Sequence, residues 1–158
     1  MLSACTGVMP AVVPSGDGRP ETLTPEQITA AINAVRRANN QPPWSYNSRL
    51  ASAAKAQANL MAQKDQLSHD LGVTLRQRVT TAGYDGAVGE NLAGGHRSIE
   101  QAIEGWMQSP GHRSTLLSPK FVEFGLAVSR VPTGRSSRYG IYWAMIAGGS
   151  FDAWRVYS

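Results

Sequence analysis

One glutamate and two histidines are the residues of this sequence best suited to chemistry. Glu90 lies among glycines and small residues in VGENLAGGH, residues 88–96, with no nearby cation to make it an ordinary surface charge. His69 in LSHDLG and His112 in SPGHRS lie at polar junctions marked by glycine or proline, where side chains tend to line clefts. A carboxylate can orient an imidazole through a ring N–H hydrogen bond. Imidazoles and carboxylates are also ordinary zinc ligands, so a metal site is one interpretation of this trio.

Each of these residues also has a structural interpretation, and a hydrogen-bonded cluster explains the trio as well. Glu90 can accept hydrogen bonds from the backbone N–H groups of a glycine-containing loop. A histidine at a helix end commonly caps the last carbonyls, and His96 is assigned to that class. A Ser–His–Asp hydrolase is disfavoured, because adjacent residues such as SHD at 68–70 cannot form a triad and no G-x-S-x-G motif occurs. We expect Asp70 to cap a backbone group or to pair with a nearby arginine such as Arg76.

Four helices are predicted to position these residues. The first begins at a capping box, Thr24-Pro25-Glu26-Gln27, and ends at NNQPP, residues 39–43. The second carries an alanine-rich inner stripe, which indicates close packing. The fourth begins at another capping-box sequence, SIEQ at 98–101, and SPG at 109–111 is expected to end it. The expected helices cover about 25–38, 48–66, 74–83 and 99–108.

The C-terminal part of the chain changes to the periodicity of strands. FGLAVSRV at 124–131 alternates, whereas YGIYWAMIAGG at 139–149 is almost continuously apolar, as expected of a strand covered on both faces. PTGRSS between them predicts a turn, so the two segments form a hairpin. Helices followed by such a hairpin predict an α+β fold, a single-domain α-β-α sandwich with an antiparallel sheet between helical layers.

Composition indicates one domain that folds without covalent cross-links. The chain has 158 residues, of which 42% are hydrophobic and 16% are charged, and these are globular values. Residues 6–21 are rich in proline, glycine and small residues without periodicity, which is typical of a flexible tether. We therefore assign residues 1–21 to an N-terminal tether and residues 22–158 to the domain. We expect the protein to be a monomer.

The net charge of +4 comes mainly from scattered arginines, without a basic run or interleaved aromatic residues. This pattern excludes specific nucleic-acid binding and allows weak attraction to anionic membrane or wall polymers. Cys5 is the one cysteine, so an intramolecular disulfide and a multi-cysteine metal site are excluded. Residues 2–5, LSAC, resemble the bacterial lipobox, in which the cysteine carries the lipid, and this resemblance predicts export and a lipid anchor at Cys5. The alternative is a chance tetrapeptide, since the resemblance covers four residues only.

Four motifs in a fixed order carry a resemblance to a known family. They are His69, ENLA at 90–93, WMQSPGHR at 106–113 and FVEFGLAVSR at 121–130. In this combination the chain resembles bacterial members of the CAP superfamily, named after cysteine-rich secretory, antigen-five and pathogenesis-related-one proteins and also called SCP-like. The resemblance covers about residues 28–154 and implies an α-β-α sandwich with a shallow cavity. In some members that cavity binds zinc or another divalent cation through two histidines and two acidic residues.

The resemblance assigns three of the four cavity residues directly. His69 and His112 match the two histidines and Glu90 matches one acid, with Asn91 and Trp106 as supporting motif residues. The place of the second acid, three residues after Trp106, is occupied by Ser109. A serine is a neutral and weaker ligand than a carboxylate, so the predicted metal ligands are His69 and His112 only. Two further acids, Glu104 and Glu123, replace the missing one only if the fold directs them inward.

Three functions are consistent with these residues. The leading hypothesis, which rests on the resemblance, is an exported, non-enzymatic binding module of the cell envelope or extracellular space with a lipid or envelope ligand. A lipid site requires an exposed apolar groove of more than a few hundred Å². The first alternative is a metal-assisted hydrolase in which His69 and His112 hold a divalent ion and Glu90 is the general base. The second is a protein-interaction module in which the cluster only stabilises the fold.

Overall fold

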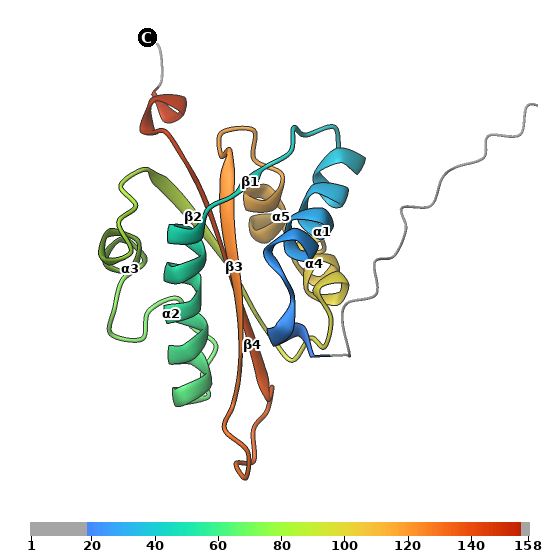
Figure 1. The fold of residues 1–158 in the computed structure, drawn as a ribbon, viewed down its shortest axis with the longest axis vertical. Helices are drawn as coiled ribbons and strands as arrows, with labels where there is room; N and C mark the ends of the chain where they lie inside the picture. The colour runs from blue at the N-terminus through green and yellow to red at the C-terminus, as the bar shows by residue number, and fades with distance from the viewer. Residues whose placement is uncertain (1–18, 156–158) are drawn as a thin grey trace, which may run out of the picture.

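The computed structural model describes residues 19–155, so Cys5 and the lipobox-like stretch lie outside the described residues. A central sheet lies between two layers of helices (Figure 1). In this part of the chain, no helix combines the length and the apolar character needed to cross a membrane. In chain order the elements are η1 (Pro20–Thr22), α1 (Pro25–Ala38), β1 (Ser45–Tyr46), α2 (Ser48–Lys64), α3 (Leu75–Thr81), β2 (Ala87–Gly94), α4 (Ile99–Met107), α5 (Pro110–Leu116), β3 (Glu123–Arg130), β4 (Ile141–Gly149) and η2 (Phe151–Trp154).

The sheet has four strands in the order β1-β3-β4-β2. The predicted hairpin is confirmed, since β3 and β4 pair antiparallel from Glu123 opposite Gly148 to Arg130 opposite Ile141. An antiparallel sheet was expected. The short strand β1 pairs parallel with β3, so the sheet is mixed. All nine residues of β4 are buried, because helices cover both faces of this inner strand.

The glycine-containing stretch around Glu90 differs from its prediction. It was predicted to be a loop, but residues 87–94 form the strand β2, which pairs antiparallel with β4 along its whole length, from Ala87 opposite Gly149 to Gly94 opposite Tyr142. Glycine weakens the local preference for a strand, so the sequence alone favours a loop. The complete ladder with β4 outweighs that preference. Glu90 is therefore held on a rigid strand.

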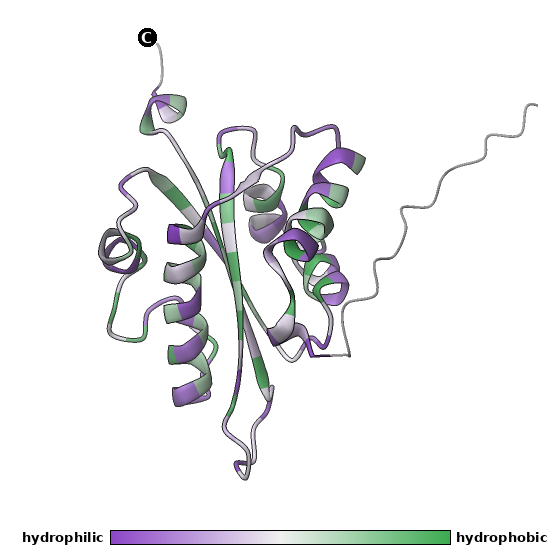
Figure 2. Ribbon diagram, in the orientation of Figure 1, coloured by the Kyte–Doolittle hydropathy of each residue, from purple (hydrophilic) through white to green (hydrophobic). Residues whose placement is uncertain are grey.

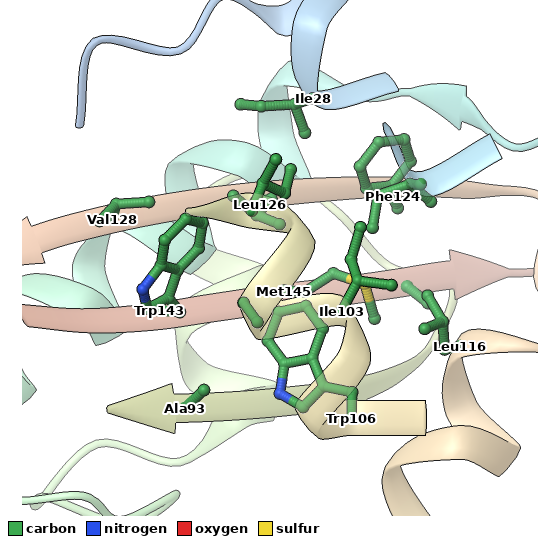
Figure 3. Close-up of a cluster of buried hydrophobic side chains, with 14 of the residues drawn as sticks. Ile28, Ala93, Ile103, Trp106, Leu116, Phe124, Leu126, Val128, Trp143 and Met145 are labelled. Atoms are coloured by element: carbon green, nitrogen blue, oxygen red, sulfur yellow. The ribbon is translucent and has the colours of Figure 1, made fainter. Parts of the chain in front are cut away.

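Two hydrophobic clusters join the helices to the sheet. α2 and α3 pack on one face, and α1, α4 and α5 pack on the other (Figure 1). Hydrophobic residues line the central strands, whereas the helices also carry hydrophilic residues (Figure 2). On the face covered by α1, α4 and α5, Trp106 of α4 and Trp143 of β4 pack together with Ile103 and Met145 (Figure 3). The alanine-rich stripe predicted for α2 is confirmed, because Ala53, Ala54 and Ala58 are almost completely buried against the other face.

Helix caps explain where most helices begin. The capping box predicted at Thr24 and Gln27 is present, with backbone-to-side-chain hydrogen bonds of 3.2 and 2.9 Å. At α4 only half of the predicted box forms, because Gln101 accepts its hydrogen bond from the backbone of Arg97. The SPG stretch ends α4 as expected but also begins a further helix, α5, with Pro110 at its first position. His112 therefore lies inside α5 and not on a junction.

A buried arginine fixes the end of α5. Arg36 of α1 is fully buried, although a charged side chain is rarely buried without partners. Its guanidinium donates to the carbonyls of Leu116 and Ser118 at 2.8 and 3.1 Å and lies 4.0 Å from the ring centre of Trp44. Burial lowers the pKa of Arg36 to about 10, so the side chain stays charged at neutral pH. The guanidinium supplies hydrogen-bond donors to backbone carbonyls at the end of α5, which have no partner within the helix.

The packed region includes the last residues of the predicted tether. Residues 20–22 form the short helix η1, and Pro20 is buried. The carboxylate of Glu21 accepts a hydrogen bond of 2.7 Å from Arg130 at the end of β3.

Candidate functional site

The centre of the candidate site is a buried ion pair between strand β2 and helix α3. Arg78 donates two hydrogen bonds to the carboxylate of Glu90, at 2.7 Å to Oε2 and 3.1 Å to Oε1. Their side chains are only 2% and 1% exposed. No cation lies near Glu90 in the sequence, because Arg78 is twelve residues away and reaches the carboxylate only when α3 packs beside β2. A bidentate pair of this kind fixes the carboxylate in one orientation.

His69 completes the cluster from the loop after α2. Its Nδ1 lies 2.8 Å from Glu90 Oε1, so the expected contact between the glutamate and a histidine is present. A carboxylate paired with arginine accepts hydrogen bonds, so Nδ1 carries the proton and Nε2 is the nitrogen available to a ligand. The side chain of His69 is 60% exposed, in contrast to its buried partner. The cluster thus presents an oriented imidazole to solvent.

His112 lies near His69 but forms a different set of contacts. Its backbone carbonyl accepts a hydrogen bond of 2.9 Å from Asn91 Nδ2, which ties α5 to β2. Burial, and secondarily the positive charge of protonated His69, lower the pKa of the His112 imidazole below its ordinary value of 6.5. The His112 ring is therefore neutral at pH 7. The supporting residue Trp106 donates from Nε1 to the Leu92 carbonyl at 2.9 Å and so joins α4 to the same strand.

The other acidic candidates do not supply a second carboxylate. Asp70 accepts a hydrogen bond from the backbone N–H of Gly72, so of its two predicted roles it caps a backbone group, whereas Arg76 donates to the Gly86 carbonyl. Glu104 is exposed on α4.

The carboxylate of Glu123 is hydrogen-bonded to residues outside the candidate site. Its carboxylate accepts hydrogen bonds from Tyr84 at 2.7 Å and from Asn47 at 3.2 Å. Burial and this hydrogen bond raise the pKa of the Tyr84 hydroxyl well above its usual range. Ser109, in the place of the missing acid, is the residue that precedes α5, and its side chain forms no capping hydrogen bond.

A pocket of about 350 Å³ opens beside the cluster. His69 and Glu90 contribute to its wall from the loop and from β2, and Asp70, Thr74 and Leu75 complete it. We call it the His69 pocket. Of the four residues predicted to line a cavity, His69 and Glu90 lie in this wall, whereas His112 and Ser109 do not. The contributions of Thr74 and Leu75 were not predicted, because they depend on the position of α3.

The arrangement does not fit a zinc ion. Within residues 19–155, no three histidine, cysteine or acidic side chains are grouped as a metal site requires. Both oxygens of Glu90 already accept hydrogen bonds from Arg78 and His69. A zinc ion bound to that carboxylate would compete with the guanidinium for the same oxygens, and Ser109 offers no replacement charge.

Comparison with known proteins agrees with this fold. Residues 29–146 match the sequence model of the CAP family, described as the cysteine-rich secretory protein family. The chain is 26% identical over 104 residues to the uncharacterized protein YkwD of Bacillus subtilis, which is 64% of this chain and 40% of that relative. It is 27% identical over 114 residues to the uncharacterized membrane protein YlbC of the same organism, which is 70% of this chain and 33% of the relative. The chain thus spans less than half the length of either protein.

Solved structures show the same architecture. An extracellular protein of Bacillus anthracis that contains an SCP domain superposes with a TM-score of 0.67 at 25% identity, over 79% of this chain and 40% of that one. An outer surface protein of Borrelia burgdorferi gives the same TM-score at 21% identity, over 79% and 91% of the two chains. The family match covers most of the chain, and the observed α-β-α layers and motif residues agree with it. The chain belongs to the CAP family.

Proposed function

We propose that this protein is an exported, non-enzymatic binding domain of the cell envelope or extracellular space, and that its ligand contacts the His69 pocket. The observation that carries the proposal is the state of Glu90, whose two oxygens accept hydrogen bonds from Arg78 and His69. A general base needs a lone pair directed at a water or a substrate proton. The carboxylate instead orients the exposed imidazole of His69, which suits ligand contact better than proton abstraction.

The locations of similar proteins support export. The Bacillus anthracis neighbour is an extracellular protein, the Borrelia burgdorferi neighbour is an outer surface protein, and YlbC is described as a membrane protein. The lipobox-like residues 2–5 point in the same direction. We extend this location to the present chain as part of the proposal, and we include a lipid anchor at Cys5.

The exposed apolar surface favours a wall component over a lipid chain as the ligand. In residues 19–155 the exposed large hydrophobic side chains are those of Leu67, Val122, Phe151 and Trp154. Leu67 follows α2, whereas Phe151 and Trp154 belong to η2 after the last strand. Four exposed side chains are few for a site that must cover an acyl chain, which requires an apolar groove of more than a few hundred Å².

Sedimentation of the full chain with envelope fractions tests the proposal. The fractions are wall sacculi freed of anionic polymers, and vesicles of phosphatidylethanolamine and phosphatidylglycerol. We expect the sacculi to retain the protein and His69→Ala to weaken retention about tenfold, since it removes a hydrogen-bonding group. Gln66→Ala, an exposed change in the same loop, is the control and should bind normally.

Three outcomes contradict parts of this proposal. Absence of retention on both fractions would refute envelope binding, and retention by vesicles alone would make the ligand a lipid. Equal retention of the unmodified protein and His69→Ala would exclude the His69 pocket and favour a protein-interaction module with a structural cluster.

Calorimetric titration with zinc near neutral pH separates this proposal from the metal-assisted hydrolase. We expect no saturable binding, because two histidines alone are a weak ligand set and the Glu90 carboxylate, paired with Arg78, is not free to join them. One-site binding that disappears in His69→Ala would support the hydrolase and lead to activity assays. His69→Ala is the informative variant because His69 is largely exposed, so its loss leaves the fold intact.

A further inference from the structure

A second pocket lies on the surface around α5 and contains no acidic side chain. Its volume is about 560 Å³, and its wall includes Arg113 and Ser114 of α5, Ser118 and Lys120 of the following segment, and Trp154 of η2. We call it the basic pocket. It shares no lining residue with the His69 pocket. Two cations and two hydroxyl groups around one depression are a suitable set of donors for an anionic oxygen group.

Both cations are available to a ligand in the described part of the chain. Arg113 forms one long hydrogen bond, 3.3 Å from Nη2 to Asn39 Oδ1, which leaves most of its donors unused. Lys120 Nζ lies 4.3 Å from the ring centre of Trp154, a cation–π contact. No carboxylate of residues 19–155 forms a salt bridge with either side chain. Cations without a carboxylate partner inside the protein gain most from an external anion.

Trp154 adds an apolar surface to this charged pocket. It is 45% exposed, whereas the other three tryptophans of the chain are at most 2% exposed. Its ring is supported by Phe121, with ring centres 5.4 Å apart. A large aromatic side chain left on the surface beside cations is typical of a binding site, because it combines an apolar face with a polar edge. Such a face can pack against the C–H groups of a sugar or polyol.

We propose that the basic pocket binds a phosphodiester-linked polyol or sugar polymer of the cell envelope. Arg113 and Lys120 contact phosphate oxygens, the hydroxyl groups of Ser114 and Ser118 donate to the same groups, and Trp154 packs against the carbon chain. Phosphate and hydrocarbon alternate along such a polymer, and the pocket offers both kinds of contact. This site is additional to the His69 pocket and extends the proposed function.

Fluorescence titration of the full chain tests this site, because Trp154 is the exposed tryptophan and reports on its own surroundings. We expect poly(glycerol phosphate) to give a saturable change and neutral dextran to give none. Arg113→Gln and Lys120→Gln should each weaken binding about tenfold, as expected for the loss of one charge-assisted contact. Arg97→Gln removes the same charge from an exposed position outside the pocket and should change binding by less than about twofold.

Trp154→Phe requires calorimetry because it removes the fluorescent reporter. We expect it to weaken binding of poly(glycerol phosphate) and to leave thermal unfolding almost unchanged, because the side chain is half-exposed. Equal effects of Arg97→Gln and Lys120→Gln would overturn the proposal and indicate diffuse attraction. Tighter binding to phosphatidylglycerol vesicles or to an oligonucleotide than to the polymer would also overturn it.

Separate variants test the two proposed sites independently of each other. Lys120→Gln should still sediment with sacculi freed of anionic polymers, because this variant leaves the His69 pocket intact. His69→Ala should still bind poly(glycerol phosphate) like the unmodified protein. Loss of polymer binding in His69→Ala would contradict the basic pocket as an independent site.

Discussion

Replacing Arg78 with methionine should lower the free energy of unfolding by about 3–5 kcal/mol, because the change leaves the Glu90 carboxylate buried without its cation. Both side chains are almost completely buried, so solvent cannot take over the role of the guanidinium. His69 contacts the same carboxylate from an exposed position and cannot compensate for the loss. Urea unfolding followed by circular dichroism measures the effect.

Two further variants separate loss of the ion pair from loss of packing. Arg78→Met combined with Glu90→Leu removes both charges and should recover most of the lost stability, since buried pairs are often replaceable by apolar residues. His69→Ala should cost less than about 1 kcal/mol, as expected for a partly exposed hydrogen-bonded pair. If the double variant is no more stable than Arg78→Met, the arginine acts mainly through the packing of its stem.

Gly125→Ala should destabilise the protein by at least about 3 kcal/mol, because a methyl group at this position in β3 has no space. A Cβ atom on Gly125 would overlap the backbone of Leu50 and Ala51 in the first turn of α2. A rotamer change cannot relieve a clash between a strand and the backbone of a helix. The helix would have to move away from the sheet, and the cap formed by Asn47 would move with it, since the Asn47 N–H donates to the carbonyl of Phe124.

Gly111→Ala is the matched control for this prediction. Gly111 lies in α5, and a Cβ atom there would meet nothing within 4 Å. Alanine favours a helix by about 1 kcal/mol over glycine, so this variant should be as stable as the unmodified protein or slightly more stable. If Gly125→Ala unfolds at the same urea concentration as Gly111→Ala, α2 does not pack against β3 as closely as the structure indicates.

The sequence by itself determined the helices and the hairpin whose patterns are local. Capping residues placed the start of α1 and, with half of the predicted box, that of α4, the alanine-rich stripe placed the buried face of α2, and the apolar run at 139–149 identified the inner strand. Each of these patterns concerns residues a few positions apart, where hydrogen bonding and burial follow directly from residue type. The order of motifs identified the family and the contact between His69 and Glu90.

Only the tertiary structure decided what surrounds Glu90. The strand β2 exists because β4 pairs with its full length, although its glycines favour a loop. Arg78 reaches Glu90 only because α3 packs beside that strand, and this partner turns a candidate base into a hydrogen-bonded anchor for His69. The basic pocket likewise joins α5 with η2, which are far apart in the sequence. Charge pairing and pocket shape depend on distances between separate elements, and residue spacing along the chain does not contain them.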